Sequence, residues 1–193
     1  MKRILTLSLM LLTTTAFAEI EEGNVGTVTN FLSWKEYQIS FPKRTTYRAL
    51  TSISNQADAH LALDHELSDC NLGQVKVLLD IGTIAEADRT MNGTGKVEVM
   101  LYNTSWGGVH DFDYSTLMSS GSTKVILSIN NFSWNGKSFY NALAIGSRVK
   151  LAFLINSRNI LVEFPLDGFD QANKKASTEC ASFKALWDLI KGK

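Results

Sequence analysis

The chain has 193 residues, of which 45% are hydrophobic and 20% are charged, a balance typical of a globular protein with a sizeable core. Its 19 basic residues equal its 19 acidic residues, so the formal net charge is zero. Without a basic stripe or a run of like charges, the sequence gives no reason to expect nucleic acid as a partner.

Residues 1–18 have the pattern of a bacterial secretory signal peptide. Lys2 and Arg3 form a basic start, and an apolar stretch too short to span a bilayer follows them. Small residues around Ala18 suit cleavage. No other apolar run approaches transmembrane length, so the mature chain is predicted to be periplasmic or secreted and to lack a transmembrane segment.

Residues 19–30 are polar and contain glycine, which predicts a flexible lead-in to a single domain over residues 31–193. Apolar residues on alternate positions then predict strands. In one of these strands, Tyr47, Ala49 and Ile53 are expected to point inward. The strands predicted in this half of the chain cover residues 31–41, 45–53, 57–67 and 74–81.

The middle of the chain has a weaker pattern. The pair Asn92-Gly93 predicts a turn within a polar connection over residues 84–95. Residues 104–121 have no clear period, and residues 132–144 fit either a short helical turn or an irregular strand. Alternation predicts strands in this part of the chain at residues 96–102 and 123–129.

The clearest pattern lies near the end of the chain. Strand-like alternation over residues 148–155 and 160–166, with polar turn formers between, predicts a hairpin. Asp167 is then expected to cap a helix. Ser177-Thr178 could start a second short helix, so one helix and two helices both fit. The apolar stripe of this helical region, expected to be core, consists of Phe169, Ala172, Ala176, Cys180, Phe183, Leu186, Trp187 and Ile190.

These elements predict a mainly β protein of the α+β class, with about eight strands and a helical region packed on them at the end of the chain. Short polar connections and the lack of β-helix-β alternation favour antiparallel pairing. The sequence is compatible with a β-sandwich and with one strongly curved sheet.

The chain has two cysteines, Cys70 and Cys180. Export would place them in an oxidising compartment, so a disulfide between the middle of the chain and the terminal helix is predicted. The alternative is a reactive thiol pair, but no C-x-x-C spacing is present to lower a thiol pKa.

A metal or acid/base site could be formed by His60, Asp64 and Glu66, which alternation places on one face of the strand over residues 57–67. His65 would face the other side. A half-exposed strand produces such a polar face by default, so a solvated face is the competing interpretation.

A second group of polar and aromatic residues could form a ligand-binding loop. His110, Asp111 and Asp113 follow Trp106 closely, and Trp134 is a further candidate for an exposed aromatic. A surface turn with solvated aspartates is the competing interpretation. The G-x-S-x-G elbow of a nucleophilic serine is absent, and no cofactor is expected.

The end of the chain resembles a family of exported proteins. The motif Ile145-Gly146, the segment Val-Glu-Phe-Pro-Leu-Asp-Gly-Phe-Asp-Gln-Ala over residues 162–172, and Cys180 carry the resemblance. They are similar to the C-terminal module of the invasion-associated locus B family and of type VI secretion accessory proteins. The resemblance implies an antiparallel sheet with a terminal helix, export from a proteobacterial cell and action through contacts at the envelope. It assigns a role to no individual residue.

The sequence therefore favours an exported protein that binds a protein or another component of the bacterial envelope. One alternative is a hydrolase or metal-dependent enzyme that uses His60 or His110 with nearby carboxylates. Another is a periplasmic inhibitor or immunity protein that inserts a loop into a secreted enzyme.

Overall fold

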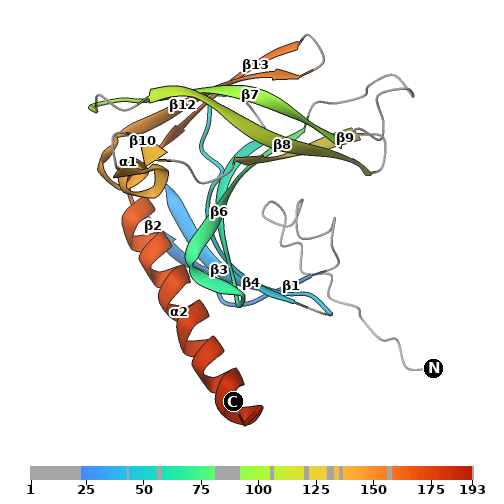
Figure 1. Ribbon diagram of the computed structural model, residues 1–193, viewed down its shortest axis with the longest axis vertical. Helices are drawn as coiled ribbons and strands as arrows, with labels where there is room; N and C mark the ends of the chain where they lie inside the picture. Colours follow the sequence, from blue (N-terminus) through green and yellow to red (C-terminus); the bar gives the residue numbers. More distant parts are fainter. Residues whose placement is uncertain are drawn as a thin grey trace, which may run out of the picture.

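The computed structural model describes residues 23–42, 44–55, 58–80, 92–104, 107–119, 122–129, 133–134, 137–155 and 158–192. Most of this part of the chain is antiparallel β-sheet, and a long helix packs on one side of it (Figure 1). The main sheet contains β1 (Asn24–Val25), β2 (Thr29–Phe31), β3 (Trp34–Ser40), β4 (Thr45–Thr51), β5 (Ala59–Glu66), β6 (Asp69–Asp80), β7 (Asn92–Leu101), β8 (Gly107–Ser119), β9 (Ser122–Ile129), β12 (Arg148–Ile155) and β13 (Arg158–Pro165). A separate small pair is formed by β10 (Ser133–Trp134) and β11 (Lys137–Ser138).

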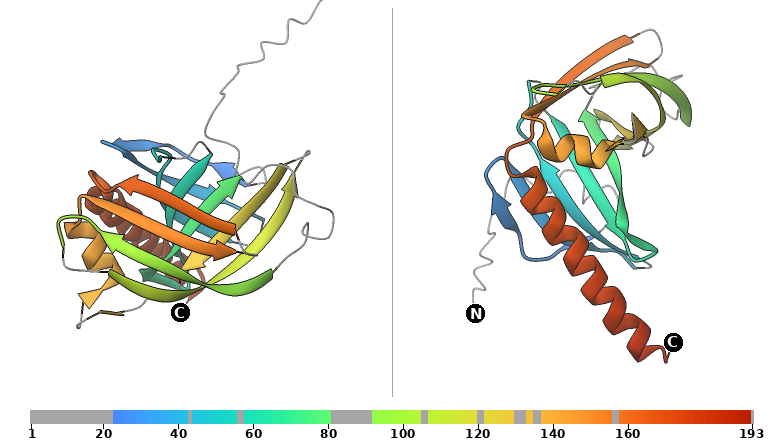
Figure 2. Two further views of the ribbon diagram at one scale, coloured as in Figure 1. Left: turned by 90° about the horizontal axis from the view of Figure 1, so that it is seen from above. Right: turned by 60° about the vertical axis from the view of Figure 1, so that its left-hand side comes forward.

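The strands of the main sheet follow the order β1-β3-β4-β5-β6-β9-β8-β7-β12-β13, with β2 paired to β3 as well. The predicted mainly β fold with antiparallel pairing and a terminal helix is confirmed, in the form of one curved sheet. Seen from above, the hairpin β12–β13 lies across β5 and β6, because the sheet curls strongly along its length (Figure 2). The two ends of the strand order are therefore brought toward each other.

The predicted C-terminal hairpin is also confirmed. The strands β12 and β13 pair antiparallel from Arg148 opposite Pro165 to Ile155 opposite Arg158. The alternating residues Val149, Leu151 and Phe153 are all buried. This segment was predictable because each of its strands has one apolar face against the core and a more polar opposite face.

One large apolar core lies on the inner face of the curved sheet. Its members come from β3 to β9, from β12 and β13, and from both helices, so the whole strand order contributes to it. Large buried side chains in this cluster include Trp34, Phe112, Phe139, Phe153, Phe164 and Phe169. A smaller cluster on the opposite face of β3 to β6 contains Tyr37, Ile39, Leu50, Ala62 and Leu78.

Two helices cover the inner face within the described residues. The short helix α1 (Phe139–Ile145) buries Phe139, Ala142 and Leu143 in the large core, which resolves the ambiguous segment as helical at this point. The long helix α2 (Phe169–Ile190) is continuous, so one helix is present where the sequence also allowed two. Neither helix has the length and apolar character needed to cross a bilayer.

The predicted cap of α2 was wrong by one residue. Gly168 occupies the N-cap position in the left-handed conformation, and it makes no side-chain cap hydrogen bond. Asp167 instead accepts a hydrogen bond of 2.8 Å from the Ser33 hydroxyl. Asp170 lies in the first turn as expected, where the helix dipole favours its negative charge.

Four features of the strands differ from the prediction. Asn92-Gly93 forms no turn but lies inside β7, paired with Ser115 and Tyr114 of β8. Ile53 lies beyond the end of β4 and is 56% exposed, so it does not point into the core. The segment without a clear period is the long strand β8. The predicted lead-in contains β1 and part of β2, which pair with β3.

Candidate functional site

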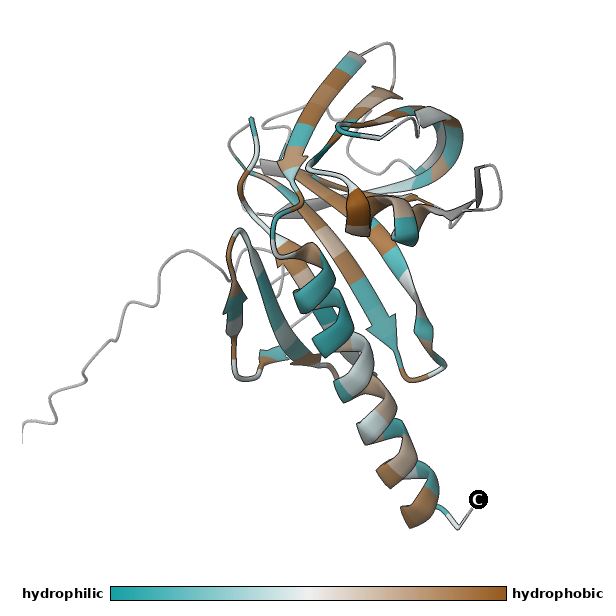
Figure 3. Cartoon of the chain, turned by 90° about the vertical axis from the view of Figure 1, so that its left-hand side faces the viewer, coloured by the Kyte–Doolittle hydropathy of each residue, from teal (hydrophilic) through white to brown (hydrophobic). Residues whose placement is uncertain are grey.

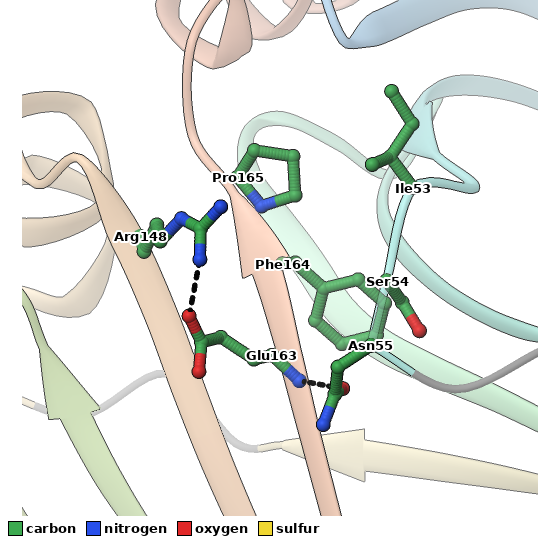
Figure 4. Close-up of a pocket in the computed structure, with 7 residues that line it drawn as sticks. All are labelled: Ile53, Ser54, Asn55, Arg148, Glu163, Phe164 and Pro165. Atoms are coloured by element: carbon green, nitrogen blue, oxygen red, sulfur yellow. Dashed lines mark hydrogen bonds and ion pairs between the residues drawn. The ribbon is translucent and has the colours of Figure 1, made fainter.

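A pocket lies beside the last strand in the order of the curved sheet. The last strand, β13, approaches the connection after β4, and the gap between them has a volume of 280 Å³ (Figure 4). Asn55 joins the two elements, because its side-chain oxygen accepts the Glu163 amide at 2.7 Å and its own amide donates to the Glu163 carbonyl at 3.3 Å. The lining residues are Ile53, Ser54, Asn55, Arg148, Glu163, Phe164 and Pro165.

One ion pair supplies the charge of this pocket. Arg148 Nη1 lies 2.8 Å from Glu163 Oε1, and the Arg148 side chain is 60% exposed. Ile53 and Pro165 provide an apolar wall beside it (Figure 4). The lining combines this ion pair with apolar side chains, an arrangement that suits a small ligand with an apolar part and a polar group.

A second, shallower hollow of 480 Å³ lies over β7, β8 and β9. It is lined by hydroxyls and amides, with Asp113 as the one carboxylate among the described lining residues. The lining residues are Asn92, Gly93, Thr94, Asp113, Tyr114, Ser115 and Ser128.

The group around His110 is not a loop. His110, Asp111 and Asp113 lie in β8, and pairing with β7 places His110 opposite Val97, Asp111 opposite Lys96 and Asp113 opposite Thr94. Alternation puts His110 on the face of the core and both aspartates on the opposite face, so the three do not converge. Asp111 forms an exposed ion pair of 2.5 Å with Lys96. Burial lowers the pKa of His110; Asp111 acts against this shift, and Lys96 acts with it.

The two tryptophans predicted to be exposed, Trp106 and Trp134, lie wholly or partly outside the described residues. Trp106 lies outside the described residues. The main chain of Trp134 pairs with that of Lys137 in β10–β11, and the Trp134 side chain is not among the described ones.

The predicted metal-binding face also does not converge. His60 Nδ1 lies 2.9 Å from the Ser52 hydroxyl, and Glu66 forms a weak, exposed ion pair of 3.8 Å with Arg44. The pairing of β5 with β6 shifts its register between Asp64 and Glu66, so the regular alternation assumed for this face does not extend to Glu66. No group of three or more His, Cys, Asp or Glu residues that could hold a metal ion occurs in the described part of the chain.

Asp64 is the centre of a buried charge network. Its carboxylate accepts bonds of 2.6 and 2.8 Å from the Arg48 guanidinium and lies 2.9 Å from Lys76 Nζ. Burial acts to raise the pKa of Asp64, but Arg48 and then Lys76 outweigh it and hold that pKa far below its usual range. The three groups lie on neighbouring strands, so this network holds β4, β5 and β6 in register.

The helix α2 is fastened to the sheet by polar contacts and by a disulfide. Lys175 Nζ lies 3.5 Å from Glu36 Oε2 on β3, and the Asn173 side chain bonds His65 Nε2 on β5 at 2.8 Å. Cys180 is bonded to Cys70 of β6, which confirms the predicted disulfide. No local pattern predicts the polar contacts, since each joins residues far apart in the chain.

Beyond the disulfide, α2 leaves the sheet. Figure 1 shows the end of the helix projecting beyond the strands, and Figure 3 shows hydrophobic segments there beside hydrophilic ones. The exposed fractions are 53% for Leu186, 43% for Trp187, 75% for Leu189 and 70% for Ile190. These four residues are called the α2 tip. Trp187 and its neighbours were predicted to be core, and that prediction was wrong because the sheet ends before the apolar stripe does.

The α2 tip is continuous with the folded interior. Phe183 packs between Tyr47 of β4, at a ring distance of 6.3 Å, and Trp187, at 6.2 Å. The tip is therefore held in place by an aromatic row that starts on the sheet. It is an ordered apolar surface whose direction relative to the sheet is fixed.

The geometry defines a mostly β protein with a strongly curved antiparallel sheet and a disulfide-fastened, projecting helix. Comparison of the chain with family models, with curated proteins and with solved structures finds no match. The likeness of the C-terminal module to exported proteobacterial proteins therefore stays a prediction.

Proposed function

We propose that this chain is an exported binding protein of the bacterial envelope that makes its contact through the α2 tip. The single observation that carries the proposal is the exposure of four large apolar side chains on two successive turns of one fastened helix. Contiguous apolar surface of this kind marks contact sites in folded proteins, and tryptophan is prominent in them.

Export is supported by two independent features. The sequence begins with the pattern of a signal peptide, and the two cysteines form a disulfide, which is the form expected in an oxidising compartment. Both features agree with the envelope as the place of action.

Binding is favoured over hydrolysis by the surroundings of the residues proposed for chemistry. Asp64 is fully engaged by two cations in the interior, and His110 lies on the opposite face of β8 from its neighbouring aspartates. A general base needs a carboxylate or imidazole that can reach a substrate proton, and the Asp64 carboxylate is instead held in the interior by Arg48 and Lys76.

Sedimentation with isolated envelope fragments tests the proposal. We expect the wild-type chain to sediment with the envelope, and the double variant Leu189→Ser/Ile190→Ser to remain in solution. Both residues are largely exposed, so the variant should fold normally. The matched control is Val109→Ser/Leu154→Ser, which removes two exposed apolar side chains from the sheet and should sediment as the wild type does. Equal sedimentation of all three proteins would refute the proposal.

A further inference from the structure

The end of α2 is amphipathic. At 100° per residue, Leu189, Leu186, Ile190 and Trp187 fall within an arc of about 160° around the helix axis. Lys184, Asp188 and Lys191 fall on the opposite arc. The apolar arc continues the face of α2 that packs on the sheet. Nearer the start of the helix, Phe183 on this face contacts Tyr47.

The charge around the α2 tip is positive. Residues 182–193 contain three lysines, Lys184, Lys191 and Lys193, and one acidic residue, Asp188. Lys184 Nζ lies 3.9 Å from Asp188, so these two charges compensate each other. Lys191 Nζ lies 4.6 Å from the centre of the Trp187 ring, which places a cation directly beside the apolar arc.

The position of the α2 tip favours a flat partner. The helix projects beyond the sheet, so a planar surface can reach the tip without colliding with the strands (Figures 1 and 2). Exposure is greatest at Leu189 and Ile190, the residues nearest the end of the helix. Apolar side chains that flank lysine and tryptophan are characteristic of helices that lie at the boundary between lipid headgroups and acyl chains.

We propose that the α2 tip binds the surface of an anionic lipid bilayer, with Leu189 and Ile190 entering the headgroup boundary and Lys191 facing lipid phosphates. This inference rests on the proposed function and names its partner. A second copy of the chain fits less well, because each tip carries an excess of positive charge and two tips would repel each other. An anionic surface attracts the same charge.

Protein-free vesicles test the inference directly. The full chain is mixed with vesicles of phosphatidylcholine alone, or of equal parts phosphatidylcholine and phosphatidylglycerol, and the bound fraction is measured after centrifugation. We expect binding to the anionic vesicles, weaker binding to the neutral ones, and a loss of binding as salt is raised.

Variants identify the surface that binds. The change Leu189→Ser/Ile190→Ser should lower the partition coefficient about tenfold or more, since each side chain removed takes apolar burial from the complex. The Lys191→Gln variant should bind anionic vesicles less well and neutral vesicles equally. Val109→Ser/Leu154→Ser should bind as the wild type does, and because the N-terminal residues are the same in every variant, their contribution cancels.

The outcomes separate this inference from the proposed function. Absence of vesicle binding, or vesicle binding that the Leu189→Ser/Ile190→Ser variant retains, overturns the lipid partner. If envelope fragments still bind the wild type and not that variant, the binding function stands and the partner is a protein. Sedimentation equilibrium that detects a dimer, converted to monomer by the same variant, would overturn the lipid partner in favour of a second copy.

Discussion

Gly168 lies against the main chain of Phe31, so closely that a Cβ atom on the glycine would overlap the Phe31 carbonyl oxygen. Gly168 also has φ of 88°, a conformation that side chains rarely adopt. The contact fixes the start of α2 beside the turn between β2 and β3. It thereby sets the direction in which the whole helix leaves the sheet.

The change Gly168→Ala is therefore expected to lower the free energy of unfolding by more than about 2 kcal/mol. Denaturant unfolding followed by circular dichroism measures the loss. Gly192→Ala is the matched control, because Gly192 also has a positive φ, 69°, but a Cβ there meets no atom within 4 Å. A loss of equal size in the two variants would show that the Phe31 contact contributes nothing.

Asp64 offers a second prediction. Asp64→Asn leaves Arg48 and Lys76 in the interior without their carboxylate, which should cost about 3–5 kcal/mol of stability at neutral pH. The pKa of Asp64 is depressed, so its contribution is present above the unfolded-state pKa and is lost only as pH falls toward the folded-state value. At strongly acidic pH, the free energy of unfolding of Asp64→Asn should therefore change less with pH than that of the wild type.

Asp111→Asn is the control for this experiment. Asp111 also forms a close ion pair, with Lys96, but its side chain is 71% exposed. Water and salt screen such a pair, so the expected loss is about 0–1 kcal/mol. If both variants lose the same stability, burial is not what makes the Asp64 network strong.

Glu36 gives a prediction of the opposite sign. Its side chain is almost fully buried between β3 and α2, where it shares Lys175 with Glu179. Burial, and then repulsion from Glu179, raise the pKa of Glu36 above its usual value of 4.5. Because the folded state disfavours the carboxylate, Glu36 contributes most to stability at acidic pH, and that contribution is lost as pH rises through the folded-state pKa.

Glu36→Gln should accordingly increase the free energy of unfolding at neutral pH, and the gain should vanish below about pH 4.5, where the wild-type carboxyl is protonated in both states. Unfolding midpoints measured across this pH range test the expectation. A variant that is less stable than the wild type at neutral pH would mean that the ion pair with Lys175 outweighs the cost of burial.

The sequence predicted those parts of the fold that depend on local alternation. Val149, Leu151 and Phe153 fall on one face of β12. Because the other face is more polar, the two-residue period is visible in the sequence. The strand β8 was missed although Phe112 and Tyr114 have the same spacing, since His110 occupies the next inward position and lowers the apolar contrast. Its neighbours Asp111 and Asp113 looked like loop residues for the same reason.

The candidate site was less predictable, because it depends on where elements end and which strands become neighbours. The helical stripe correctly placed Phe169 and Ala172 in the core, but no local pattern shows that the sheet stops short of Trp187. Likewise, the polar spacing of His60 and Asp64 carried no information about Arg48, which reaches Asp64 from the neighbouring strand.

The disulfide leads to the last prediction. Cys70 and Cys180 close a loop of 110 positions, and the bond joins α2 to β6 just before the α2 tip leaves the sheet. In the chain-entropy view, removing a cross-link over such a loop lowers stability by about 4–5 kcal/mol at most. The double variant Cys70→Ser/Cys180→Ser should show this loss in denaturant unfolding, and the reduced wild type should match it.

Hydrogen exchange in the same variant should become faster in α2 from Cys180 to Ile190. The increase should be smaller in β12 and β13, because those strands are held by their own hydrogen-bond ladder. Faster exchange spread evenly over the sheet would indicate that the bond supports the whole fold and has no special relation to the projecting end of the helix.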